Sequence, residues 1–116
     1  MGRVIPIYEK DIKRDIVRYL KINGVFCWVN VSGGIWDPKK QFFRKQNGFG
    51  MILGASDILG LYKGTFIAIE VKRKPNKPTR EQEFFLSQIR RQGGLGLVAY
   101  SLEDVIERFK GIFNNA

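Results

Sequence analysis

The stretch Asp57-Ile-Leu-Gly-Leu-Tyr-Lys-Gly-Thr-Phe-Ile-Ala-Ile-Glu-Val-Lys72 decides the fold of this chain. It predicts two strands, residues 57–62 and 65–72, joined by the two-residue turn Lys63-Gly64. Side chains alternate between the two faces of a strand, so one face of the second strand holds Phe66, Ala68, Glu70 and Lys72. Two charged side chains therefore share one face of a sheet.

The segments on either side of this hairpin predict a single α/β domain over residues 1–116. A helix, a strand, a helix, a strand and a helix are expected at residues 8–22, 25–31, 79–92, 95–100 and from Ser101 onward. The predicted order is αβββαβα, with helices flanking a mixed central sheet. The connection to the last strand is long enough for a right-handed parallel crossover, so this strand should extend the sheet that holds Glu70.

Residues 35–54 resist periodic assignment. They mix aromatic side chains with Lys39, Lys40, Arg44 and Lys45, and they carry three glycines. The glycines only approximate a dinucleotide-binding fingerprint, so that interpretation is rejected. The aromatic residues are equally compatible with a contact between two subunits and with a cover over the core.

The composition points to a polyanionic partner. The 116 residues include 20 Lys plus Arg against 11 Asp plus Glu, a formal net charge of +9. Neutralising phosphates releases condensed counterions, which favours nucleic acid, although excess charge can also serve solubility alone. Histidine is absent from the sequence, which removes histidine bases, Ser-His-Asp systems and the usual zinc ligand sets. Any catalysis must therefore use carboxylates, lysines and a hard metal ion.

Two further features concern the single cysteine and the expected location of the protein. The single cysteine, Cys27, lies in a strand-like segment and is interpreted as a small buried apolar side chain. The sequence has neither an apolar run as long as a membrane span nor an N-terminal signal peptide. No membrane contact is predicted, and the cytoplasm is the expected location.

The residues that carry chemistry are Asp57 and, across the hairpin, Glu70-Val71-Lys72. Mg²⁺ takes oxygen ligands, and two carboxylates on paired strands can supply them. Lys72 can contact the attacking water or the scissile phosphate. A bare Glu-x-Lys triplet is often only an exposed rim. Here Asp57 precedes it, a basic loop follows it, and Glu9 and Gln82 lie on the apolar stripes of flanking helices.

Four pieces of sequence together resemble a known family: Glu9, Gly54-Ala-Ser-Asp57, Glu70-Val-Lys72 and Thr79-Arg-Glu-Gln82. They are similar to the VRR-NUC domain, the virus-type replication-repair nuclease branch of the PD-(D/E)xK restriction-endonuclease-like superfamily, in its stand-alone phage or bacterial form. The resemblance covers roughly residues 8–108 and is most specific between Gly54 and Gln82. One departure is visible, because Ser56 stands where this superfamily usually has proline.

The resemblance implies a role for each matching residue. Asp57 and Glu70 would bind Mg²⁺, with the Val71 carbonyl as a third ligand and Mn²⁺ as a substitute metal. Glu9 would act through water or serve a second ion, and the alternative is a helix-start carboxylate favoured by the macrodipole. Lys72 would be the catalytic lysine. Gln82 would orient Lys72 or the nucleophilic water, and the alternative is a capping box with Thr79.

DNA contacts are expected from the loop that follows Lys72. Its cations are Arg73, Lys74, Lys77 and Arg80, for which a solvated loop is the alternative. The basic residues of the segment 35–54 are candidates for further DNA contacts, namely Lys39, Lys40, Arg44 and Lys45.

The family resemblance further implies a structure-specific DNA endonuclease of repair or recombination. It would act as a homodimer on branched DNA such as four-way (Holliday) junctions, in a bacterial or phage-infected cell. Water would attack the phosphorus in line and leave a 3′ hydroxyl. Three alternatives stay open: a less selective nicking or restriction-like nuclease, a non-catalytic basic DNA-binding module, and an RNA-binding protein that stacks bases on Tyr8, Trp28 or Trp36.

Overall fold

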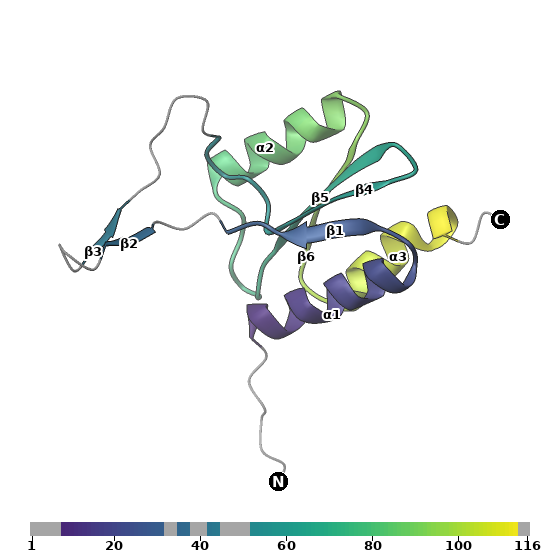
Figure 1. Ribbon diagram of the computed structural model, residues 1–116, viewed down its shortest axis with the longest axis horizontal. Coiled ribbons are helices and arrows are strands. Elements are labelled where there is room, and N and C mark those ends of the chain that lie inside the picture. The colour runs from purple at the N-terminus through teal and green to yellow at the C-terminus, as the bar shows by residue number, and fades with distance from the viewer. Residues whose placement is uncertain (1–7, 32–34, 38–41, 45–51, 114–116) are drawn as a thin grey trace, which may run out of the picture.

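The computed structural model describes residues 8–31, 35–37, 42–44 and 52–113, and it confirms the predicted αβββαβα order. The core elements are α1 (Glu9–Ile22), β1 (Phe26–Val29), β4 (Ile58–Tyr62), β5 (Thr65–Val71), α2 (Arg80–Arg91), β6 (Leu95–Ala99) and α3 (Leu102–Phe113) (Figure 1). A second, two-stranded sheet is formed by β2 (Ile35–Asp37) and β3 (Phe42–Arg44). Neither of these two strands was predicted.

The central sheet has the strand order β1-β4-β5-β6. Strands β1 and β4 pair antiparallel, as do β4 and β5, whereas β5 and β6 pair parallel. The parallel pair is connected through α2, which is the crossover that the length of the connection predicted. The prediction that the last strand extends the sheet containing Glu70 is confirmed.

Helices α1 and α3 cover one face of the sheet and form the main core with it (Figure 1). The alternation in β5 sends Ile67, Ile69 and Val71 into this core, where α1 contributes its apolar stripe. That stripe consists of Ile12, Ile16 and Leu20, all buried. Each fully buried aliphatic side chain of this kind contributes about 1.5–3 kcal/mol.

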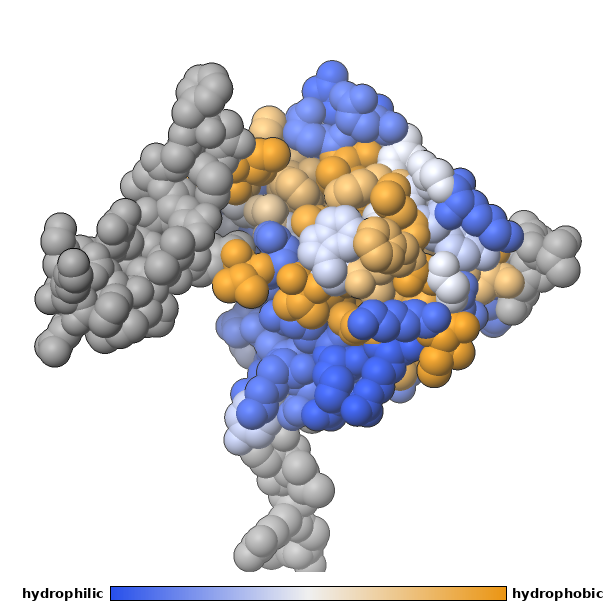
Figure 2. Space-filling model, viewed as in Figure 1, coloured by the Kyte–Doolittle hydropathy of each residue, from blue (hydrophilic) through white to orange (hydrophobic). Residues whose placement is uncertain are grey.

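Helix α2 covers only part of the opposite face. Its Phe85 and Leu86 pack against Ala68, so the predicted division of the two faces of β5 is confirmed. Beyond α2, the outer side chains of β1 and β4 remain exposed, at 69% for Phe26 and 41% for Leu61. Figure 2 shows these apolar residues gathered over the part of the sheet between α2 and α1.

Most of the segment 35–54 lies outside the described residues. The backbones of β2 and β3 pair antiparallel, with Trp36 opposite Phe43. The interpretation of this segment as a contact between subunits stays a prediction. None of the described helices is long and apolar enough to cross a membrane.

Candidate active site

Two carboxyl groups meet at the open end of the β4–β5 hairpin. Ile58 of β4 pairs with Ile69 of β5, so Asp57, one residue earlier, lies across from Glu70. The backbone amide of Val71 donates a 2.8 Å hydrogen bond to Asp57 Oδ2. This bond continues the hairpin one step beyond its last backbone pair and fixes the position of the Asp57 side chain.

Glu70 is buried, with only 3% of its surface exposed. Among the described residues, its Oε1 atom has no hydrogen-bond partner. The pKa of Glu70 is raised to about 8, and burial is the largest cause. A side-chain hydrogen bond between Glu70 and Asp57 and the negative charge of Asp57 also raise this pKa. The charges of Lys72 and Lys13 lower this pKa, but they do not outweigh burial. The site therefore holds two carboxyl groups that cannot both ionise without cost.

Two ammonium groups lie beside these carboxyls. Lys72 Nζ is 3.9 Å from Glu70 Oε2, and Lys13 Nζ is 3.6 Å from Asp57 Oδ1. The sequence predicted the position of Lys72 but not that of Lys13, which comes from α1. A signal was available, because Lys13 lies one turn after Glu9 and directly beside the buried Ile12.

The loop that carries Asp57 is held by a close backbone contact with α2. Gly54 has a φ of 77°, and a Cβ atom added there would lie 2.4 Å from the backbone carbonyl of Glu81. Ser56, directly before Asp57, is fully buried. Within the described part of the chain its hydroxyl has no hydrogen-bond partner. Only glycine fits at position 54, so the loop and the first turn of α2 are packed as one unit.

Gln82 lies in the first turn of α2 and forms the capping box that was one of its two predicted roles. Its backbone amide donates to Thr79 Oγ1 at 3.2 Å, and its Oε1 accepts from the Thr79 amide at 2.8 Å. A side-chain amide also carries an NH₂ group, which is not used by this box. An additional role toward Lys72 or a water stays a prediction.

Glu9 is the first residue of α1 and is half-buried. The described residues contain no group of three Asp, Glu, Cys or His side chains that could hold a metal ion together, so Glu9 is not brought close to both Asp57 and Glu70. The predicted role through water, or with a second ion, is not tested by this arrangement.

The cations predicted to bind DNA fall into two groups. The first group is exposed and lies in the loop after Lys72 and at the start of α2, namely Arg73, Lys74, Lys77 and Arg80. Among them, Lys74 Nζ lies 5.8 Å from the centre of the Tyr100 ring. In the segment 35–54, Arg44 ends β3, and Lys39, Lys40 and Lys45 lie outside the described residues.

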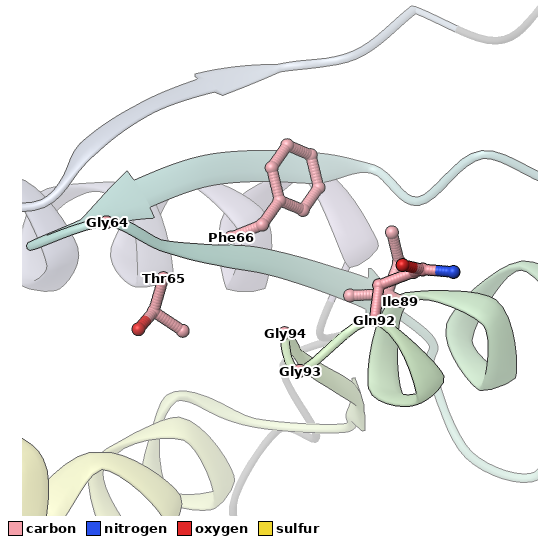
Figure 3. Close-up of a pocket in the computed structure, with 7 residues that line it drawn as sticks. All are labelled: Gly64, Thr65, Phe66, Ile89, Gln92, Gly93 and Gly94. Carbon is pink, nitrogen blue, oxygen red and sulfur yellow. The ribbon is translucent and has the colours of Figure 1, made fainter.

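A separate pocket of about 270 Å³ lies at the turn end of the same hairpin (Figure 3). It is lined by Gly64, Thr65, Phe66, Ile89, Gln92, Gly93 and Gly94. This lining has no ionisable side chain, and Figure 3 shows Thr65 and Gln92 as its polar members. The carboxyl groups at the opposite end of β5 are therefore the better candidate for chemistry.

The open end of the hairpin offers the oxygen donors that a hard dication requires. These are the carboxylates of Asp57 and Glu70, and the predicted role of the Val71 carbonyl as a third ligand stays a prediction. A dication would partner the buried Glu70 oxygen and relieve the repulsion between the two carboxylates. Mg²⁺ tolerates one or two protein carboxylates, with water and phosphate oxygens completing its shell, so these residues fit it.

Comparison of the chain with protein-family models and with curated proteins gives no match.

Proposed function

We propose that the protein is a Mg²⁺-dependent DNA endonuclease that hydrolyses phosphodiester bonds at the open end of the β4–β5 hairpin. The observation that carries the proposal is the buried Glu70, with the partly exposed Asp57 across from it and Lys72 beside it. A buried carboxyl oxygen without a partner costs stability, and such groups are concentrated at functional sites. The net charge of +9 and the exposed cations after Lys72 support a nucleic-acid substrate.

Each residue of the site has a distinct part in the proposed reaction. Asp57 and Glu70 would hold the metal ion, which, when bound, neutralises charge on the scissile phosphate and lowers the pKa of water. The Val71 amide orients Asp57 through the 2.8 Å hydrogen bond. Lys72 would donate to a phosphate oxygen and stabilise the negative charge that grows during in-line attack. The basic loop from Arg73 to Arg80 would hold the neighbouring phosphates.

The finer proposal is that the substrate is branched DNA, such as a four-way junction, cut by a homodimer in repair or recombination. This part rests on the resemblance to stand-alone VRR-NUC domains. A two-fold dimer presents two sites to two strands, which matches the symmetry of a junction. A less selective nuclease would use the same residues on linear duplex, so substrate comparison separates the two.

The test is cleavage of labelled four-way junction, flap and linear duplex by the purified protein, with Mg²⁺, Mn²⁺ or EDTA. We expect cutting only with the metals, and loss of cutting with retained DNA binding in Glu70→Ala. The exposed Glu107→Ala is the control of equal charge change. Preference for the junction supports the finer proposal, and equal cutting of linear duplex overturns it. Tight binding without any cutting would identify a non-catalytic DNA-binding module instead.

A further inference from the structure

Helix α1 carries a second stripe beside the apolar one that packs on the sheet. Lys10, Lys13, Arg14, Val17, Arg18 and Lys21 follow one another at helical spacings of three and four residues, so they share one side of the helix. Together with Val29 of β1 they line a hollow of about 350 Å³ between the helix and the edge of the sheet. Figure 2 shows the corresponding hydrophilic band over α1, below the apolar face of the sheet.

The charges of this basic stripe are not all available for a partner. Arg14 lies 3.3 Å from Asp11 and 3.6 Å from Asp15, and Lys13 pairs with Asp57. Among the described residues, Lys10, Arg18 and Lys21 have no carboxylate within ion-pair distance. All three are exposed, so the stripe presents unbalanced positive charge along its length.

The position of the stripe ties it to the candidate active site. Lys13 belongs to the stripe and also contacts Asp57, so the stripe passes the carboxyl groups near its N-terminal end and continues away from them along α1. Eleven residues of α-helix separate Lys10 from Lys21, a rise of about 16 Å. One strand of B-DNA presents a phosphate every 3.4 Å, or about five over this distance.

We infer that the basic stripe of α1 binds the sugar-phosphate backbone of the DNA that enters the site, in addition to the loop after Lys72. The inference rests on the proposed function for its substrate. A groove with cationic walls and two valines suits a phosphate backbone, because the lysines and arginines contact the phosphates and the apolar lining can contact the sugars. Helix α1 reaches the carboxyl pair through Lys13 at Asp57, and the loop between β5 and α2 begins after Lys72 at Glu70. The substrate would thus be held on two sides of the scissile phosphate.

The experiment measures the salt dependence of DNA binding in EDTA, where no cutting occurs. The full-length protein with Lys10→Gln, Arg18→Gln and Lys21→Gln is compared with a control carrying Lys63→Gln, Arg91→Gln and Lys110→Gln. The control loses the same charge at exposed positions outside the hollow. Affinity for a 30-base-pair duplex, a length of about 100 Å at 3.4 Å per base pair, is followed by fluorescence anisotropy from low to high salt.

We expect the slope of log affinity against log salt to become shallower by about two to three in the stripe variant, since each lost phosphate contact removes nearly one unit. The slope of the control variant should change by less than one. Equal changes in the two variants overturn the inference. So does a stripe variant that keeps its DNA slope but no longer binds vesicles of anionic phospholipid.

The outcomes also separate this inference from the proposed function. A protein that never cuts DNA with Mg²⁺ but shows the difference in slope would refute the nuclease and leave the stripe in place. A protein that cuts normally without that difference would refute the stripe alone. Thermal melting of both variants checks that each is folded.

Discussion

The two ends of the β4–β5 hairpin are built in opposite ways. At the turn end, Lys63 and Gly64 are exposed, and the neighbouring pocket has no ionisable lining residue. At the open end, Glu70 is buried beside Asp57, with its pKa raised. A buried carboxylate costs stability unless it is fully partnered. The difference teaches that the open end is organised for something other than stability, which is the pattern expected of a functional site.

The largest contrast should appear between the lysines at the two ends. We expect Lys72→Met to lower single-turnover DNA cleavage by at least about a hundredfold, because removing a group that stabilises developing charge has an effect of this size. Lys63→Met at the turn should leave the rate unchanged. Methionine keeps the aliphatic part of the side chain and removes only the charge. Similar rates for the two variants would remove Lys72 from the proposed chemistry.

Two glycines sharpen the same comparison in terms of stability. Gly54 and Gly64 both have a positive φ, 77° and 84°. A Cβ at Gly54 would meet backbone atoms of α2, whereas among the described residues no atom lies within 4 Å of a Cβ at Gly64. Gly64→Ala should therefore lower the free energy of unfolding by about 1–2 kcal/mol, because alanine disfavours a positive φ. Gly54→Ala should cost about 3 kcal/mol or more, because the contact with Glu81 must open. Urea unfolding measures both, and equal losses would show that the loop is not packed tightly on α2.

The titration of Glu70 gives a third contrast, in metal-free protein. Its folded pKa of about 8 lies above the reference value of 4.5, so the folded state binds this proton more tightly than the unfolded state. The resulting stabilisation is fully present below about pH 4.5 and is lost as the pH rises toward 8. Relative to Glu70→Gln, the wild type should lose on the order of a few kcal/mol over this range.

The measurement is urea unfolding in EDTA at several pH values. Glu107→Gln, at an exposed position, is the control and should run parallel to the wild type. Added Mg²⁺ should restore stability to the wild type at high pH and have little effect on Glu70→Gln. Parallel pH profiles of Glu70→Gln and the wild type would mean that the buried carboxyl group is not strained.

The smallest effect is expected at the capping box of α2. Thr79→Ala removes the acceptor of the Gln82 amide, and Gln82→Ala removes the acceptor of the Thr79 amide. Each variant thus loses one of the two bonds of the box and should lower stability by about 1 kcal/mol. If Gln82 also orients Lys72 or a water, Gln82→Ala alone should reduce cleavage, by less than Lys72→Met does. Equal cleavage by the two alanine variants would limit Gln82 to its role in the cap.

The fold was predictable where local patterns are strong. Alternation in β5 and the three- and four-residue spacing in α1 and α2 placed the core elements within two residues of their observed bounds. The β2–β3 pair was missed because residues 35–54 show no sustained alternation and contain several glycines. Nothing in that segment distinguishes short strands from an irregular loop.

The site was predictable only as far as the hairpin determines it. Pairing of β4 with β5 brings Asp57 opposite Glu70, and Lys72 follows on the same strand. Lys13 was missed although it lies one turn after Glu9, because α1 carries several cations and the one that reaches Asp57 depends on how the helix docks. The close contact between Gly54 and α2 is likewise a tertiary feature that no local pattern reports.

Asp57 and Glu70 belong to one hairpin, and this closeness in sequence has a consequence for the order in which the site forms during folding. Asp57 and Glu70 come together through a hairpin, which closes with little loss of chain entropy, whereas Lys13 must arrive with a helix from a distant part of the sequence. The chain would thus meet its own charge repulsion before one of the two compensating cations is in place. Refolding should therefore be faster below pH 8, where the Glu70 carboxyl can take up a proton as it is buried, than above pH 8, where it stays ionised.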